Sequence, residues 1–139
     1  MDGFIWAAFT CYSLSVIFAV IIGFMYLLNP KFFNYHEWVL GRKWEELDFK
    51  LQTLLVAFMK GVGGAIVALG LAMAAMIIFA FRSNEMWSYY TIPIVSLIAW
   101  GIWLYLMMFI RGKTNAKTPI FVPAIGIVLI VIGFILSFF

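Results

Sequence analysis

The chain has 139 residues, of which 66% are hydrophobic and 11% are charged, and its formal net charge is +3. The mean hydropathy of +1.09 lies far above that of soluble domains, so the composition excludes a soluble globular domain and predicts an integral membrane protein. The single cysteine and single histidine exclude an intrachain disulfide and leave too few ligands for a zinc or haem site. We therefore expect neither a metal ion nor a cofactor.

Four apolar stretches are each close to or above the length of about 20 residues that a helix needs to cross a bilayer. They cover residues 4–28, 53–81, 86–110 and 120–139. Helices satisfy their own backbone groups in lipid, and the alternating polar positions of a membrane barrel are absent. The predicted fold class is all-α: four transmembrane helices in an antiparallel up-down bundle, forming one domain over residues 1–139. The tail before the first stretch carries only Asp2 and lacks the basic segment of a signal peptide, so the first span should be retained.

The basic residues predict the orientation of these spans. The first connection carries Lys31, Arg42, Lys43 and Lys50, the third carries Arg111, Lys113 and Lys117, and the second carries Arg82 alone. Because cytoplasmic connections are enriched in Lys and Arg, loops 29–52 and 111–119 are predicted to be cytoplasmic, with both termini outside the cell (inner) membrane. Acidic neighbours accompany these cations, so the lipid bilayer is the expected partner and nucleic acid is not.

The first connection is predicted to contain a helix of its own, at about residues 30–40. Asn29 and Pro30 form a typical helix start, and Gly41 suits the residue just past a helix end. The residues between them are too apolar for a solvated loop and too few to cross a bilayer. We therefore expect this short helix to lie in the membrane interface.

The second spanning helix is expected to begin well before the lipid, near Trp44. Glu45, Glu46 and Asp48 fall where the first turn of that helix would lie, and acidic groups there offset its dipole. The residues that follow have an apolar side and a polar side at helical spacing, which predicts an amphipathic lead into the span.

Lys60 is the one charge that adjoins a spanning stretch with no polar linker between. The uncharged run 61–81 after it already covers about 31 Å as a helix, which is the full hydrocarbon thickness. Lys60 is therefore expected at the inner border, with its ammonium group extended to the lipid headgroups. The alternative is a cation inside the bundle that contacts an anion or a substrate.

Small residues follow Lys60 at helical spacing and predict a smooth face on the second span. They are Gly61, Gly64, Ala65, Ala68 and Ala72. Such a face lets another helix approach closely. Packing within the bundle is the first interpretation, and a homodimer seam or a larger membrane partner is the alternative.

Two neighbouring residues of the predicted interfacial helix, His36 and Glu37, are the weak candidates for catalysis. An interfacial histidine of this kind is usually structural, so we expect no catalytic residue. The alternative is a proton-linked group at the cytoplasmic face that acts with Glu37, Lys60 or Tyr26. No serine, threonine or cysteine nucleophile is paired with His36 by a known motif.

Polar and indole side chains of the first and third spans are predicted at similar depth in the outer half of the membrane. They are Tyr12, Ser13, Ser96, Trp100 and Trp103. One interpretation is a polar-floored pocket that holds an apolar ligand with one hydrogen-bonding end. The other is a set of hydrogen bonds that joins the helices, with Ser and Trp bonded to each other or to backbone carbonyls.

These patterns favour a non-enzymatic membrane protein that packs with itself, as a homo-oligomer, or with a larger membrane complex. A small-solute transporter or channel lined by Lys60 and the polar set is one alternative, and a binder of a lipid-like ligand is another. A third is a membrane-interface enzyme that uses His36 and Glu37. Spans one and two do not resemble spans three and four, so the internal repeat typical of transporters is absent.

Overall fold

The computed structural model describes residues 3–139; Met1 and Asp2, on which the predicted outside position of the N-terminus partly rests, lie outside the described residues. The described chain is all-helical. Its elements are α1 (Gly3–Leu28), α2 (Asn34–Leu40), the 3₁₀ turn η1 (Trp44–Glu46), α3 (Phe49–Ala75), the π-helical segment η2 (Met76–Phe81), α4 (Ser88–Thr114) and α5 (Phe121–Leu136).

Three helices are long and apolar enough to cross a membrane: α1, the continuous helix Phe49–Phe81 formed by α3 and η2, and α4. The chain is therefore an integral membrane protein. The fourth predicted span, 120–139, contains only the 16 residues of α5, about 24 Å of helix, so a fourth crossing is not confirmed. The α-helix ends at Leu136, where Ser137 donates a hydrogen bond from Oγ to the Gly133 carbonyl at 2.7 Å.

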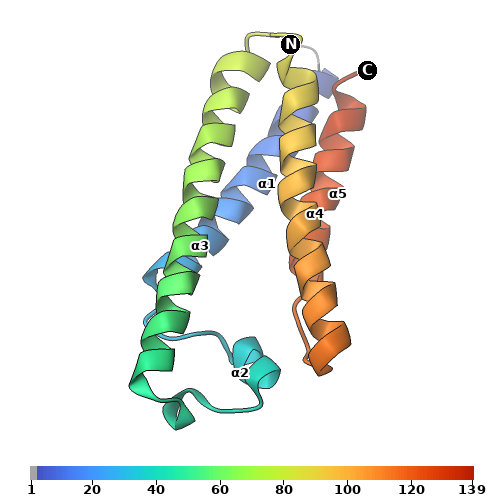
Figure 1. Ribbon diagram of the computed structural model, residues 1–139. Coiled ribbons are helices and arrows are strands. Elements are labelled where there is room, and N and C mark those ends of the chain that lie inside the picture. The colour runs from blue at the N-terminus through green and yellow to red at the C-terminus, as the bar shows by residue number, and fades with distance from the viewer. Residues whose placement is uncertain (1–2) are drawn as a thin grey trace.

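The long helices splay apart from one end of the molecule to the other. Figure 1 shows α3 and α4 converging at the end where η2 lies and diverging toward the end where α2 sits between them. α1 packs against both α3 and α5, and α4 packs on α5, whereas α3 and α4 meet mainly through η2. The N- and C-terminal ends of the described chain lie at the same end of the molecule (Figure 1).

Glycines allow the closest approach between helices. A Cβ on Gly63 of α3 would lie 2.7 Å from the Gly23 carbonyl oxygen of α1, and a Cβ on Gly70 would overlap Val20. On α5, Gly126 accommodates the Trp100 ring and Gly133 accommodates the Tyr12 ring. Any larger residue at these positions would push the helices apart.

The predicted small-residue face of the second span packs differently from the first interpretation. Its members Gly61, Ala65, Ala68 and Ala72 are exposed on α3, and a Cβ on Gly64 would only touch Leu27. Packing of this stripe within the bundle is therefore a wrong prediction. The closest contact with α1 uses the opposite-facing Gly63 and Gly70, where an added Cβ would lie 2.5 Å or less from atoms of α1.

The ends of the short helix also differ from the prediction. α2 begins at Asn34 rather than at residue 30, because the segment before it is extended and places Phe32 in a small core with Leu47 and Met59. The Phe32 ring lies edge-on to Trp44, with 4.6 Å between ring centroids. Gly41 ends α2 with φ of +65°, as predicted for a residue just past a helix end.

The second spanning helix begins at Phe49 and not near Trp44. Asp48 is its N-cap, and its carboxylate accepts hydrogen bonds from the backbone N–H groups of Lys50 and Leu51 at 3.0 and 3.1 Å. Glu46 instead accepts from the Lys43 N–H at 3.2 Å, which closes the separate turn η1. The acidic run is thus divided between two helix starts.

Candidate functional site

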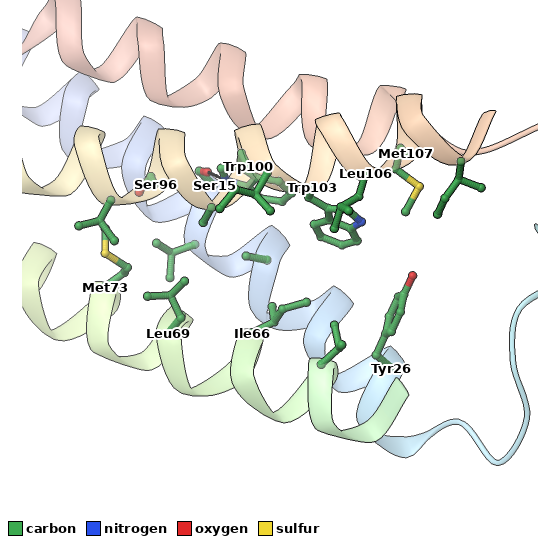
Figure 2. A pocket seen from close by; sticks show the side chains of 18 of the residues that line it. Ser15, Tyr26, Ile66, Leu69, Met73, Ser96, Trp100, Trp103, Leu106 and Met107 are labelled. Atoms are coloured by element: carbon green, nitrogen blue, oxygen red, sulfur yellow. Dashed lines mark hydrogen bonds between the residues drawn. The ribbon is translucent and has the colours of Figure 1, made fainter. Parts of the chain in front are cut away.

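A cavity of about 430 Å³ lies between α3 and α4, with α1 behind it and α2 at one end. This groove, as we call it below, is lined mainly by apolar side chains, including Ile66, Leu69 and Met73 of α3 and Leu106 and Met107 of α4. Figure 2 shows these two sets facing one another across the space, with α1 behind. No helix of the described residues covers the side opposite α1 (Figure 1), so the groove faces the surrounding membrane.

An aromatic row forms one wall of the groove. The rings of Trp100 and Trp103 stack with 5.6 Å between centroids and an interplanar angle of 4°. Phe18 stacks on Trp100 at 5.8 Å, and Tyr26 lies edge-on to Trp103 at 6.2 Å. Trp100, Trp103 and Tyr26 thus present aromatic surface to the groove, and Phe18, which is not a lining residue, packs on Trp100.

One end of the groove is polar but satisfied within the protein. The indole Nε1–H of Trp100 donates to Ser15 Oγ at 3.0 Å, and Ser96 lines the same region. Trp100 and Ser15 are buried. This end therefore offers few free hydrogen-bonding groups to a ligand.

The other polar end lies beside α2. Tyr26 and Tyr35 hydrogen-bond through their hydroxyl groups, and His36 lines the cavity next to them. Nδ1 of His36 accepts from the Phe33 N–H at 3.1 Å, so the neutral ring carries its proton on Nε2. Burial lowers the pKa of His36 from 6.5 to about 4, and burial together with Tyr26 raises the pKa of Tyr35. All three groups are thus uncharged at neutral pH.

The structure brings only part of the predicted polar set to the groove. Ser96, Trp100 and Trp103 line it, as the pocket interpretation requires, and Trp100 also bonds to a serine, as the joining interpretation requires. Tyr12 lies elsewhere, buried between α1, α5 and η2, where its ring contacts Phe81 at 5.4 Å. Its hydroxyl pairs with Ser137 Oγ at 3.3 Å. Ser13 does not line the groove either.

Lys60, His36 and Glu37 do not form a common site. Lys60 is exposed on α3 and does not line the groove. Glu37 accepts a hydrogen bond from the Trp44 N–H through Oε1 at 3.2 Å, which ties α2 to η1. His36 is turned toward Tyr26 and Tyr35 instead, so the side chains of these neighbours serve different contacts.

The sequence-based prediction missed several residues of the groove. Ala19 of α1, Tyr35 of α2 and Met73 of α3 line it and were not singled out. Ser15 and Tyr26 of α1 also line it; Ser15 belongs to the polar run of the first span, and Tyr26 was named only as an alternative partner of His36. The three α1 residues are four and seven positions apart and so share one helix face. That spacing was a usable signal, whereas the contribution of α2 depends on how the first connection folds back.

The site as a whole suits a neutral, mainly apolar molecule. Among residues 3–139, no three His, Cys, Asp or Glu side chains lie close enough together to hold a metal ion. Hydrogen-bonding groups are available at one end of the groove, and apolar surface occupies the rest. The helices and this groove define an integral membrane protein with an apolar, laterally open cavity. No protein-family model, curated protein or solved structure matches this chain.

Proposed function

We propose that this chain binds an amphipathic, lipid-like molecule in the groove between α3 and α4 without transforming it. The observation that supports this most is the distribution of chemistry: a cavity of about 430 Å³ with apolar walls and neutral polar groups gathered beside α2. Its volume is in the usual range for small-molecule sites. A solute that dissolves well in water would leave its polar groups unpaired along these walls.

The groove suggests how such a molecule would lie. Its polar end would meet the Tyr26 and Tyr35 hydroxyls and the Nε2–H of His36, and its apolar part would extend past Trp103 toward Met73. The open side faces the membrane, so a lipid could enter laterally without crossing water (Figure 1). Neutral groups at the polar end favour an alcohol, amide, ester or carbonyl over a strongly charged headgroup.

We further propose that α5 completes a fourth crossing of the cell (inner) membrane, with the first and third connections cytoplasmic. α5 has 16 apolar helical residues, and its ends are flanked by more apolar chain from Ile120 to Phe139. The two ends of the described chain lie together, which an even number of crossings requires (Figure 1). In this arrangement α2 and the polar end of the groove lie at the cytoplasmic border.

The test uses the purified chain in mild detergent with added dioleoylglycerol, whose headgroup is a neutral hydroxyl, followed by native mass spectrometry. The wild type should retain one lipid molecule. Ala99→Phe places a ring inside the groove, since Ala99 lines it, and should lower retention on the order of tenfold. Ala68→Phe makes the same change on the outward face of α3 and should leave retention unchanged. Equal retention by the Ala99 variant and the wild type would contradict the proposal.

A second candidate function is packing with a copy of itself or with another membrane protein, as the sequence favours. The outward position of Gly61, Ala65, Ala68 and Ala72 supports it, because these small residues leave a smooth strip of α3 free for a neighbouring helix. Here Ala68→Phe should disperse an oligomer, and Ala99→Phe should not. The two phenylalanine variants therefore separate the two functions in one set of spectra.

The transporter and enzyme alternatives have less support. Lys60 is exposed and is not among the residues that line the groove, so it contributes no charge to the groove wall. Nδ1 of His36 and Oε1 of Glu37 each accept a backbone hydrogen bond, so neither atom is available as a base.

A further inference from the structure

A second amphipathic site lies on the other side of Tyr26 and Tyr35, between the connections that follow α1 and precede α5. An open hollow of about 630 Å³, the basic hollow, is lined by Lys31 and Lys117 together with aromatic residues. A partly open apolar cleft of about 210 Å³ adjoins it and shares the lining residues Phe33, Tyr35 and Pro119. We propose that these two spaces bind one anionic phospholipid, which is a different ligand from that of the groove.

The cations of the basic hollow are suited to a phosphate. Lys31 follows the end of α1 and Lys117 precedes the start of α5, so the fold brings together two lysines far apart in sequence. Within residues 3–139 neither lysine forms an ion pair, and no carboxylate of the described chain lines this hollow. Asn29 and Asn34 add amide groups to the rim. Two unpaired ammonium groups with amide donors match a phosphodiester headgroup at a membrane border.

The position of Lys117 is held by the structure. Thr118 is buried, and its Oγ1 donates a hydrogen bond to the Met107 carbonyl of α4 at 3.0 Å. This bond fixes the chain beside Lys117 against the end of α4. The backbone at the rim is thus set before any lipid binds, which reduces the ordering cost of binding.

The apolar cleft gives the second half of the argument. Ile22 and Met25 of α1 face Val122 of α5 across it, and Trp103 and Met107 of α4 form its inner wall. An acyl chain attached to a phosphate at the lysines can continue into this cleft. A free phosphate in water would gain nothing from it, so the continuity of basic and apolar surfaces points to a lipid.

The same lining shows why the two sites are distinct. Tyr26, Tyr35, Trp103 and Met107 line both the groove and the cleft and so separate them. The groove has neutral polar groups at its end, whereas the basic hollow has two lysines. Neutral ligands should therefore bind in the groove, and anionic ligands should bind at the basic hollow.

The experiment compares dioleoylphosphatidylglycerol with dioleoylphosphatidylcholine, each added to the detergent-solubilised full chain and detected by native mass spectrometry. The wild type should retain the anionic lipid preferentially. Replacing both cations, Lys31→Gln with Lys117→Gln, should lower its retention on the order of 30-fold, from about fivefold per lysine. The control pair, Lys43→Gln with Lys113→Gln, removes the same amount of charge outside the hollow. This variant should retain the anionic lipid as the wild type does.

Further arms keep the proposal falsifiable. Lys31→Arg with Lys117→Arg preserves charge and should bind the anionic lipid like the wild type, so loss there as well would overturn the proposal. Equal retention of the two lipids by the wild type, or an equal loss in the control pair, would also overturn it. Inorganic phosphate should not displace the lipid; displacement would assign the hollow to a free anion. Ala99→Phe should leave the preference for the anionic lipid intact. Failure of the groove proposal can therefore be told apart from failure of this one.

Discussion

Trp100 on α4 and Ser15 on α1 form a hydrogen bond of 3.0 Å between two side chains that are only 5% and 1% exposed. The face of the same indole packs against Gly126 of α5 and stacks with Trp103. One side chain therefore connects three helices and also forms part of the wall of the groove. Its hydrogen bond keeps the wall in place, because a ring held at its Nε1–H cannot rotate into the cavity.

The first prediction concerns this bond. Ser15→Ala should lower the free energy of unfolding by about 1 kcal/mol, because it leaves the buried indole N–H without a partner. Thermal unfolding in detergent would measure the change. Ser13→Ala is the matched control, since Ser13 is half-buried on the same helix and makes no side-chain hydrogen bond within the described chain. An equal loss of stability in both variants would contradict the role of the bond.

The second prediction distinguishes the glycine contact that holds α1 and α3 together from the exposed stripe. Gly63→Ala should destabilise the protein by about 1–3 kcal/mol, because the new Cβ would meet the α1 backbone, which cannot move aside like a side chain. Gly61→Ala meets nothing within 4 Å and should be neutral or slightly stabilising. Chemical unfolding of the two variants provides the comparison. A larger loss of stability in Gly61→Ala than in Gly63→Ala would show that the exposed stripe makes the contact between helices.

A third prediction follows from the histidine beside the groove. Burial lowers the pKa of His36 to about 4 from 6.5, so between these values the unfolded chain binds more protons than the folded one. The contribution of His36 to stability is complete above pH 6.5 and is lost as the pH falls toward 4. The melting temperature should therefore drop across this window more in the wild type than in His36→Gln, which cannot titrate.

The two proteins differ only at position 36, so the difference between the two curves isolates the histidine. Parallel curves for the wild type and His36→Gln would show that the ring is solvated. In that case burial would not be what keeps the ring neutral at the polar end of the groove.

The fourth prediction concerns Lys60. Because this side chain is exposed and does not line the groove, Lys60→Met should change stability by no more than about 0.5 kcal/mol. Retention of added dioleoylglycerol should also be unchanged. Loss of lipid retention in Lys60→Met would show that Lys60 contributes to the groove, and would support its interpretation as a cation inside the bundle.

The local features that the sequence predicted well depend on neighbours along the chain. The apolar stretches became α1, the helix Phe49–Phe81, α4 and the shorter α5 because each holds enough consecutive apolar residues to form a helix in lipid. Gly41 ends α2 because glycine adopts its φ of +65° at no steric cost. The helix starts were less predictable. Burial of Phe32 keeps the residues before α2 extended, and capping by Asp48 sets the start of α3, and neither effect can be read from local helix propensity.

The candidate site was predictable only in part. Ser96, Trp100 and Trp103 were identified because polar and indole groups in a span must find partners, and that requirement is visible in the sequence. The sequence alone also determined that the protein is built of apolar helices for a membrane. Only the tertiary structure decided which faces of those helices meet. That choice followed from Gly63, Gly126 and Gly133, where small residues on one helix meet large or backbone groups on another, a complementarity that no single helix contains.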